Sequence, residues 1–460
     1  MEELKKTLSY SVLVIGGGIA GIEAALNLAD FGLHVYLVED TPSIGGLMAR
    51  LDKTFPTNDC SICIEAPKMY EVQKHPNIEL LTNTEVRRIK GKAGDFKVRL
   101  QKKPRFVDEE KCKGCGKCSE VCPVTVPDEL DGKISGKRKL IYIPFPQAVP
   151  NIYIVDDLCR YGKMREKGAC IGGCIIDCIQ CRECPIAKCV KACKDEGADA
   201  VLLWQTAKPM DVEVRSIVVA SGVESFEPPQ GLYGYGVYEN VITNLQFERL
   251  MNAGGPTNGE IVRPSDGTHP KKIAWIQCVG REKRVGIPYC SKVCCMVATK
   301  QTIITKEHHE DVETYIFNNN LKTYGKGFHE FYTKAKGLGV KYVLGKPSDV
   351  FLDPRTKGLT IRYENLEKGE VEEKKVDLLV LSTALIPSNR NKRLSKALRI
   401  ELDEHGFFKE KDPLNSPLET NVKGIFLCGG ATGPIDISES VAQAEAASVK
   451  AVQTRWSDGD

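Results

Sequence analysis

The distribution of cysteines constrains this 460-residue chain more than any other feature. Twelve of its nineteen cysteines lie in one block that ends at Cys193. The first four have the spacing C-x2-C-x2-C-x3-C and precede a proline: Cys112, Cys115, Cys118 and Cys122. In this spacing three thiolates on one tight loop bind a 4Fe-4S cluster, and the fourth usually reaches a second cluster. The run predicts iron–sulfur clusters, because a zinc ribbon more often has two separated C-x2-C pairs.

Eight further thiols follow in the same block and could bind two more clusters. They are Cys159, Cys170, Cys174, Cys178, Cys181, Cys184, Cys189 and Cys193. Spacing alone does not assign these thiols to individual clusters. Cys178, Cys181 and Cys184 have the C-x2-C-x2-C spacing of one cluster loop. For any single thiol the alternative is a free cysteine that packs as a small apolar side chain.

The first forty residues carry a complete dinucleotide-binding pattern. A short apolar run predicts a buried parallel strand, and the glycines of a G-x-G-x-x-G motif follow it at Gly16, Gly18 and Gly21. An Ala-rich helical stretch comes next, and then a second strand that ends at Glu39. The glycines allow a tight turn, close approach of a pyrophosphate and helix packing, and the acidic residue accepts a hydrogen bond from a ribose hydroxyl.

Three later segments bear on which dinucleotide is bound. Gly45 and Gly46 follow the acidic residue closely, an apolar strand ends at Gly222, and a glycine pair that includes Gly430 precedes an Ala-rich helix. Together they resemble the FAD domain of flavoproteins with two dinucleotide-binding domains, such as thioredoxin reductase. The resemblance implies that these glycines lie along FAD. It departs at Gly430, where many such enzymes have an Asp that contacts the ribityl chain.

A second dinucleotide-binding domain is expected in the middle of the chain. Its first strand, 272–277, runs into Cys278 without a G-x-G-x-x-G motif, which argues against NAD(P)H as the direct electron donor. Cys278, Cys290, Cys294 and Cys295 lie within 18 residues and can bind a further cluster. The alternative is a redox dithiol formed by Cys290 with Cys294 or Cys295.

The remaining cysteines have weaker patterns. Cys60 and Cys63 form a C-x2-C pair that cannot hold a cluster alone. Either another segment or a partner chain completes their ligand set, or they are structural thiols. Cys428 is expected to be a packing residue. The seven histidines show no ligand spacing.

The predicted fold class is α/β, with two dinucleotide-binding domains of the thioredoxin-reductase type and an inserted ferredoxin-like iron–sulfur domain. Five segments are expected. They are an FAD-binding first part (1–104), the ferredoxin-like insert (105–205), a return and linker (206–267), a degenerate NAD(P)-binding-like domain (268–385) and the C-terminal part of the FAD-binding domain (386–460).

Composition excludes several classes of function. A formal net charge of +3 with 27% charged residues offers no electrostatic case for binding nucleic acid or an anionic membrane. No apolar run reaches the length of a membrane span, and the N-terminus lacks the apolar region of a signal peptide. A cytoplasmic location is therefore expected, where nineteen cysteines point to metal or redox chemistry rather than disulfides. An anaerobic host is also expected, because oxygen damages exposed clusters.

These motifs together resemble the A-type subunit of the heterodisulfide reductase family. The resemblance rests on the glycine motif, the Cys112 run and further segments at 55–69, 75–81, 235–249, 263–267, 289–295, 325–328 and 433–444. The sequence departs from the family in two ways. Longer members have an additional cluster domain at each end, which this sequence does not contain, and the insert of this sequence has extra cysteines.

The resemblance implies an FAD and 4Fe-4S electron-transfer subunit with two to four clusters. It implies partner subunits of the B and C type that reduce a disulfide, an electron-input subunit linked to a hydrogenase or dehydrogenase, and a homodimer within a larger complex. Whether this chain performs flavin-based electron bifurcation is left open. The alternatives are a relay flavoprotein of a sulfur- or quinone-linked complex and a stand-alone disulfide oxidoreductase.

Overall fold

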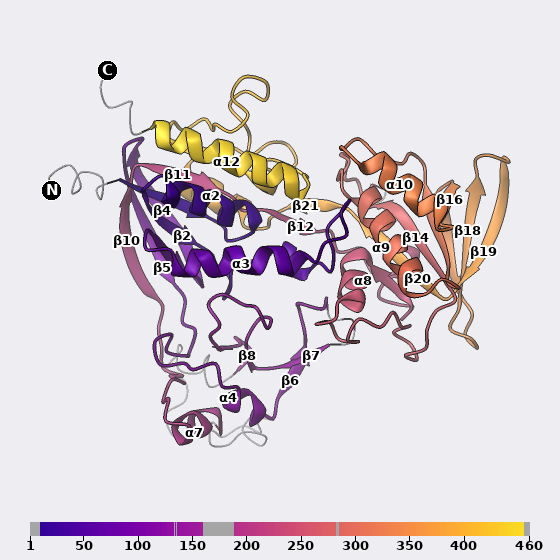
Figure 1. Cartoon of the computed structure of the whole chain (residues 1–460), viewed down its shortest axis with the longest axis horizontal. Coiled ribbons are helices and arrows are strands. Elements are labelled where there is room, and N and C mark those ends of the chain that lie inside the picture. The colour runs from indigo at the N-terminus through magenta and orange to yellow at the C-terminus, as the bar shows by residue number, and fades with distance from the viewer. Residues whose placement is uncertain (1–9, 133, 135, 160–187, 282–284, 455–460) are drawn as a thin grey trace.

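The computed structural model describes residues 10–132, 134, 136–159, 188–281 and 285–454. Figure 1 shows three lobes: a first domain built from both ends of the chain, a second domain beside it, and an insert that projects below the first domain. Five predicted cluster ligands lie outside the described residues: Cys170, Cys174, Cys178, Cys181 and Cys184.

A five-stranded parallel sheet forms the centre of the first domain. Its strands stand in the order β22 (Ile425–Leu427), β11 (Ser216–Val219), β1 (Ser11–Ile15), β2 (His34–Val38) and β3 (Ile78–Leu81). One face packs against α2 (Ile19–Asp30), α3 (Ser61–Lys74) and α12 (Ile437–Gln453). Because both faces are covered, β1 is an almost uniformly apolar and buried run.

The other face is covered by a three-stranded antiparallel sheet. Its strands stand in the order β10 (Lys208–Val214), β5 (Asp95–Lys102) and β4 (Thr84–Lys92). β5 and β10 are paired neighbours although the whole insert lies between them in the sequence. The insert therefore leaves and rejoins the first domain at one place, and the sheet can form as it would without the insert.

The second domain repeats the parallel architecture. Its sheet has the order β13 (Val241–Thr243), β20 (Leu378–Thr383), β14 (Lys272–Val279), β15 (Glu313–Asn318) and β16 (Lys341–Leu344). Helices α8 (Asn244–Met251), α9 (Cys294–His308) and α10 (Phe328–Gly337) pack on one face, and the antiparallel strands β17 (Pro347–Leu352), β18 (Leu359–Asn365) and β19 (Glu370–Val376) pack on the other.

Short elements connect the two domains. β12 (Val223–Ser225) pairs with β21 (Leu385–Pro387), and α11 (Asn391–Leu398) returns the chain to the first domain. In the part of the chain that the structure describes, no helix is long and apolar enough to cross a lipid bilayer. The predicted α/β class, with two dinucleotide-type domains and an insert in the first, is confirmed.

The insert has a small apolar core of its own. Phe106, Val107, Ile141 and Ala200 form part of it, and Cys118 and Cys193 are buried in it. Its described elements are short: α4 (Lys117–Glu120), β6 (Thr125–Pro127), β7 (Lys137–Lys139), β8 (Ile141–Tyr142), β9 (Ile154–Val155) and α7 (Lys188–Asp195). So little regular structure needs another source of stability, which bound clusters can supply.

A buried ion pair holds the two domains together. Lys300 of α9 and Glu248 of α8 are paired at 2.7 Å, and each side chain is only 1% exposed. Both reach across to the first domain, because Lys300 Nζ donates to the carbonyl oxygen of Lys53 at 2.7 Å and Glu248 accepts from the backbone N–H of Asp52 at 3.0 Å. Gln301 completes the set by donating to Glu248 at 2.6 Å.

We expect Glu248→Ala to destabilise the fold by about 3–5 kcal/mol, because it leaves the Lys300 ammonium buried without a partner. The free energy of unfolding, or the apparent Tm at a fixed scan rate, measures this. Glu373→Ala is the matched control, since its pair with Arg362 is exposed and should contribute below about 1 kcal/mol. An equal loss of unfolding free energy in the two variants would contradict a stabilising role for the buried ion pair.

Candidate functional site

A cavity of about 710 Å³ lies at the carboxyl end of the first sheet. Six of the eight residues predicted to bind the cofactor line it: Gly16, Gly18, Glu39, Gly46, Gly222 and Gly430. Gly21 and Gly45 do not line it. Parallel α/β sheets bind ligands at this edge.

The turn from β1 to α2 explains the three glycines of the motif. It has only three residues, 16–18. A Cβ on Gly16 would lie 2.2 Å from the carbonyl oxygen of Ala220, and a Cβ on Gly21 would lie 1.8 Å from that of Gly16. These two glycines allow close packing of the backbone. Gly18 differs, because the nearest atom to its Cβ would be 3.8 Å away, so the space beside it is available to a ligand.

Glu39 is fixed at the end of β2. Its two carboxylate oxygens accept hydrogen bonds from the backbone N–H groups of Gly17 at 2.7 Å and Thr41 at 2.9 Å. Each oxygen keeps a second lone pair for a ribose hydroxyl. Burial raises the pKa of the neighbouring Asp40 to about 6, although the guanidinium of Arg390 at 2.6 Å opposes the shift.

The walls of the cavity carry charges of both signs. Four arginines line it, Arg50, Arg138, Arg390 and Arg393, together with eight acidic residues, and Arg390 and Arg393 pair with two of those acids, Asp40 and Glu85. The N-terminus of α12 also opens onto it, through Ile437 and its N-cap residue. A helix N-terminus attracts negative charge. The free space at Gly18 and the N-terminus of α2, which has no side-chain cap, fit the pyrophosphate of FAD.

Four thiols of the insert line a second, much smaller cavity. They are Cys112, Cys115, Cys118 and Cys193. The first three come from the loop before and at the start of α4, and the fourth comes from α7. The backbone N–H of Ala200 donates to the sulfur of Cys193 at 3.2 Å. The structure therefore groups three thiols of the C-x2-C-x2-C run with a distant fourth, a grouping that spacing did not give.

The charges in this cavity need compensation. Burial, and then the neighbouring thiolates, raise the pKa of Cys118 to about 12. Four thiolates in a small space lined by Val107, Ala200 and Val201 would repel one another without positive charge among them. The iron of a cluster supplies that charge, so the donor set fits a 4Fe-4S cluster.

The other described cysteines of the insert surround the same apolar core. Cys122, Cys159 and Cys189 pack against it while remaining partly exposed. Cys122 does not line the small cavity with the first three of its run. This separation is the one that a ferredoxin-type spacing predicts, since the fourth thiol serves another cluster.

The second domain gathers four thiols at the carboxyl end of its sheet. Cys278 lies in β14, Cys290 lies in the following loop, and Cys294 and Cys295 begin α9. The interaction of the neighbouring thiols Cys294 and Cys295 raises the pKa of Cys294 and lowers that of Cys295 to about 7. Burial raises the pKa of Cys278, and the charges of Cys295 and Cys290 add to the rise. The four thiols that the sequence singled out therefore share one neighbourhood.

One local feature supports a ligand there. Cys278 has φ of 61°, a left-handed conformation that a residue with a side chain adopts at a cost of about 1–3 kcal/mol. Strain of this kind accumulates at functional sites.

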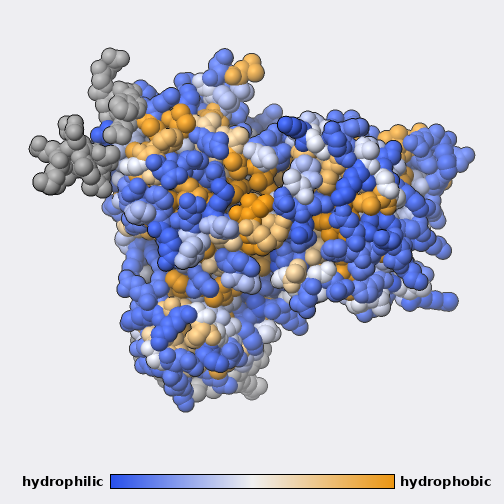
Figure 2. Space-filling model, viewed as in Figure 1, coloured by the Kyte–Doolittle hydropathy of each residue, from blue (hydrophilic) through white to orange (hydrophobic). Residues whose placement is uncertain are grey.

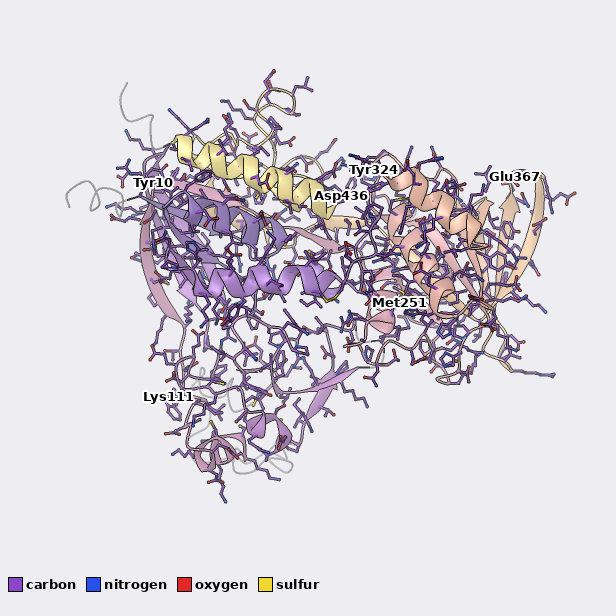
Figure 3. The ribbon with its side chains drawn as sticks, viewed as in Figure 1. Tyr10, Lys111, Met251, Tyr324, Glu367 and Asp436 are labelled. Atoms are coloured by element: carbon purple, nitrogen blue, oxygen red, sulfur yellow. A yellow bond between two sulfur atoms is a disulfide. The ribbon has the colours of Figure 1, made fainter. Side chains whose placement is uncertain are left out.

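The thiol loop is adjacent to the cavity of the first domain. Lys292, between Cys290 and Cys294, forms an ion pair with Glu439 of α12 at 2.8 Å. The ring of Tyr324 lies 5.2 Å from the same ammonium, and Figure 3 labels Tyr324 and Asp436 close together in the view, at the junction of the two domains. Asp436 lines the large cavity, so one helix terminus contacts both sites.

The connection after β14 differs from the one after β1. It has fourteen residues, 280–293, instead of three. A phosphate cradle needs the helix to begin directly after the strand, so that its N–H groups meet the pyrophosphate. Here the helix begins with two cysteines.

Two further expectations concern the cysteines outside these thiol sets. Cys60 and Cys63 form a disulfide, a pairing that the sequence analysis did not weigh. Cys428 is fully buried in the first core, as expected of a packing residue.

Histidine spacing indicated no metal site, yet the ligand atoms of Glu260, His269 and His309 lie within 4.8 Å of one another. They come from the loop before β14 and from the end of α9, so sequence spacing could not reveal them.

Comparisons with known proteins agree with this geometry. A family described as FAD dependent oxidoreductase matches residues 11–105, and one described as 4Fe-4S binding domain matches residues 105–127. These matches confirm the oxidoreductase class and the predicted cofactor types, FAD and 4Fe-4S clusters. The number of clusters stays a prediction.

Curated relatives confirm the resemblance seen in the motifs. The chain is 46% identical over 440 residues to the A-type iron–sulfur subunit of the CoB–CoM heterodisulfide reductase of Methanocaldococcus jannaschii, covering 95% of this chain and 63% of the relative. It is 45% identical over 454 residues to an iron–sulfur subunit of the same type from Methanopyrus kandleri, covering 98% and 65%. The chain thus spans less than two thirds of the length of these relatives.

Solved structures of similar fold include the thioredoxin reductase of Lactococcus lactis. It has 15% sequence identity and a TM-score of 0.49, with 97% of this chain and 99% of that chain covered. The thioredoxin reductase of T. acidophilum has 12% identity and a TM-score of 0.49, with 97% of each chain covered.

We expect Gly18→Leu to abolish FAD binding without unfolding the chain, because its side chain would fill ligand space rather than clash with protein. A loss of about 3 kcal/mol corresponds to roughly 100-fold weaker binding. The flavin-to-protein ratio after gel filtration measures this. Gly337→Ala is the control, since Gly337 lies in α10 with helical backbone and nothing lies within 4 Å of its Cβ position. A folded Gly18→Leu protein with full flavin would show that the site is elsewhere.

We expect Cys193→Ala to lower the iron content of anaerobically purified protein by about four atoms per chain, the content of one 4Fe-4S cluster. Cys193 supplies the fourth thiol of the small cavity. Cys428→Ala is the control, because Cys428 is buried among apolar side chains and should leave iron unchanged. Unchanged iron in Cys193→Ala would separate this thiol from the cluster.

Proposed function

We propose that this chain, a homologue over nearly its whole length of the A-type iron–sulfur subunits of heterodisulfide reductases, transfers electrons between FAD and iron–sulfur clusters in a heterodisulfide-reductase-like complex. The observation that carries this proposal is the position of Cys278, Cys290, Cys294 and Cys295. They stand at the carboxyl end of β14, where a domain of this kind would hold a nucleotide, and their loop contacts α12 beside the large cavity.

The residues of the chain have distinct roles in this proposal. Gly18 leaves space for the pyrophosphate, and Glu39 accepts from the ribose. The N-terminus of α2, which has no side-chain cap, would stabilise the negative charge of the pyrophosphate. When bound, FAD exchanges electrons in pairs and each cluster exchanges them singly. We retain the five predicted segments, 1–104, 105–205, 206–267, 268–385 and 386–460, as the proposed domain division.

Partners are proposed from the relatives. A curated relative from Methanothermobacter marburgensis, 43% identical, is named as the A-type subunit of an H(2):CoB-CoM heterodisulfide,ferredoxin reductase. We propose B- and C-type subunits that reduce a disulfide, an electron-input subunit linked to a hydrogenase or dehydrogenase, and a homodimer within the complex. Flavin-based electron bifurcation is a further proposal by the same comparison, and the cytoplasm is the proposed location.

A second candidate function is a disulfide oxidoreductase that uses thiols of the second domain. The observation that favours it is the pair of adjacent buried thiols at the start of α9, where the interaction with Cys294 lowers the pKa of Cys295 to about 7. A lowered thiol pKa is typical of a reactive cysteine. In an electron-transfer subunit these thiols would bind iron, whereas in a disulfide oxidoreductase two of them would form a titratable disulfide.

We expect Cys294→Ala to lose the iron and the paramagnetic signal of one cluster while it keeps FAD, because this buried thiol belongs to the second-domain set and not to the cavity lining. Anaerobic iron and flavin analysis with EPR spectroscopy measures both. Cys428→Ala is again the control. If Cys294→Ala keeps all its iron and instead loses a disulfide detected by thiol titration, the oxidoreductase function is correct.

A further inference from the structure

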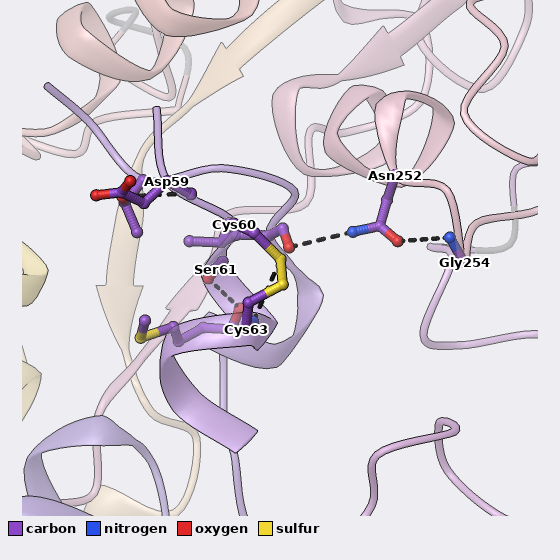
Figure 4. The surroundings of a disulfide bond; sticks show 9 residues. Asp59, Cys60, Ser61, Cys63, Asn252 and Gly254 are labelled. Atoms are coloured by element: carbon purple, nitrogen blue, oxygen red, sulfur yellow. Dashed lines mark hydrogen bonds between the residues drawn. A yellow bond between two sulfur atoms is a disulfide. The ribbon is translucent and has the colours of Figure 1, made fainter. Parts of the chain in front are cut away.

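The proposed electron transfer between FAD and clusters does not use the disulfide between Cys60 and Cys63. It joins the residue before α3 to the first turn of that helix, with a Cα–Cα distance of 5.2 Å (Figure 4). Cys63 is exposed, and Cys60 is partly buried. Figure 2 shows apolar residues gathered near the middle of the face turned to the viewer, in the region of α3 and α12.

This disulfide contributes little to the stability of the fold. The chain-entropy contribution of a disulfide grows with the loop that it closes and reaches about 3 kcal/mol for a 15-residue loop. Here the two cysteines are three positions apart. In a reducing compartment, an exposed disulfide of this kind is more often catalytic or redox-sensing than structural.

The two sulfur atoms are chemically different. Cys60 is the N-cap of α3, and its Sγ accepts a hydrogen bond from the backbone N–H of Cys63 at 3.3 Å. Backbone donors and the helix dipole stabilise a thiolate at this position. Cys63 is the more exposed sulfur. An attacking thiolate therefore reaches Cys63, and Cys60 departs as the stabilised leaving group.

The surroundings connect the disulfide to the wall of the large cavity. Ser61, between the two cysteines, donates from Oγ to the carbonyl oxygen of Met48 at 2.8 Å. Met48 and Leu51 both line the cavity. The carbonyl oxygen of Leu51 accepts from Asn252 of the second domain at 3.4 Å, as Figure 4 shows. The pair thus lies at the domain junction, against the segment that forms the cavity wall.

We propose that Cys60 and Cys63 form a thiol–disulfide exchange site for a dithiol. One thiolate of the dithiol attacks Sγ of Cys63, the bond between the two cysteines breaks, and Cys60 leaves as a thiolate that takes up a proton. The second thiol of the dithiol then attacks the mixed disulfide and releases Cys63 as a thiol. Two electrons and two protons pass to the pair, and the dithiol becomes a disulfide. This goes beyond the proposed electron transfer and does not depend on it.

A redox titration tests the proposal directly. The anaerobically purified, cluster-loaded chain is equilibrated with mixtures of reduced and oxidised dithiothreitol, and N-ethylmaleimide then blocks free thiols. Trypsin cleavage after Lys53 and Lys68 gives peptide 54–68, which contains these two cysteines and no other. The expected result is a two-electron transition in which the peptide changes from no label to two labels. Thioredoxin in place of dithiothreitol shows whether a protein dithiol also serves.

Two serine variants test the asymmetry. At a pH high enough to ionise both thiols, we expect Cys60→Ser to form a mixed disulfide with a dithiobis(nitrobenzoate) probe roughly tenfold faster than Cys63→Ser, because only the former leaves the exposed sulfur free. Reduction by dithiothreitol, by thioredoxin or by both supports the proposal and identifies the source of the dithiol.

Two other outcomes would overturn the proposal. A peptide that stays disulfide-bonded until the chain is denatured is a structural crosslink. A peptide that carries two free thiols at every ratio, together with loss of iron in Cys60→Ser, is part of a cluster ligand set. Iron analysis of both variants beside Cys428→Ser separates these outcomes without any measurement of enzyme activity.

Discussion

The length of chain between a central parallel strand and the next helix decides what each domain can bind. After β1 the helix starts within three residues, so its first N–H groups meet the edge of the sheet where a pyrophosphate binds. After β14 the connection has fourteen residues, and the helix begins with Cys294 and Cys295. The same sheet topology therefore supports a dinucleotide cavity in one domain and a thiol cluster in the other.

Charge compensation links the two sites. The large cavity offers the uncapped N-terminus of α2 to the pyrophosphate of a dinucleotide. The thiol sets instead need positive charge brought in by iron, because burial and neighbouring thiolates raise the pKa of Cys118. The Lys292–Glu439 ion pair joins the second-domain loop to α12, so the two kinds of site meet at one helix terminus.

Local patterns predicted the parts of the molecule that depend on neighbouring residues. The β1–α2 turn, Glu39 and the Cys112 run are encoded within a few residues, and the structure gives them the expected surroundings. The pattern could not distinguish a glycine that gives space to a ligand from one that allows packing. Gly18 faces the cavity, whereas Gly21 packs against the backbone of Gly16.

Non-local groupings could not be predicted. The fourth thiol of the small cavity, Cys193, comes from a helix at the far end of the insert, and only the packing of the insert core brings it to Cys112. The disulfide between Cys60 and Cys63 was not predicted, because the spacing of two cysteines does not show that one is a helix N-cap and the other is exposed. His269 and His309 meet only through tertiary structure.

The central claim is that a cluster has replaced the pyridine nucleotide as the electron partner of the flavin. Anaerobic stopped-flow absorbance tests it by mixing the loaded chain with NADH or NADPH, or with a low-potential one-electron donor such as reduced ferredoxin. The account predicts rapid flavin bleaching by the one-electron donor and no rapid bleaching by either nucleotide. Rapid bleaching by NADH or NADPH would contradict it, because the fourteen-residue connection would then hold a nucleotide after all.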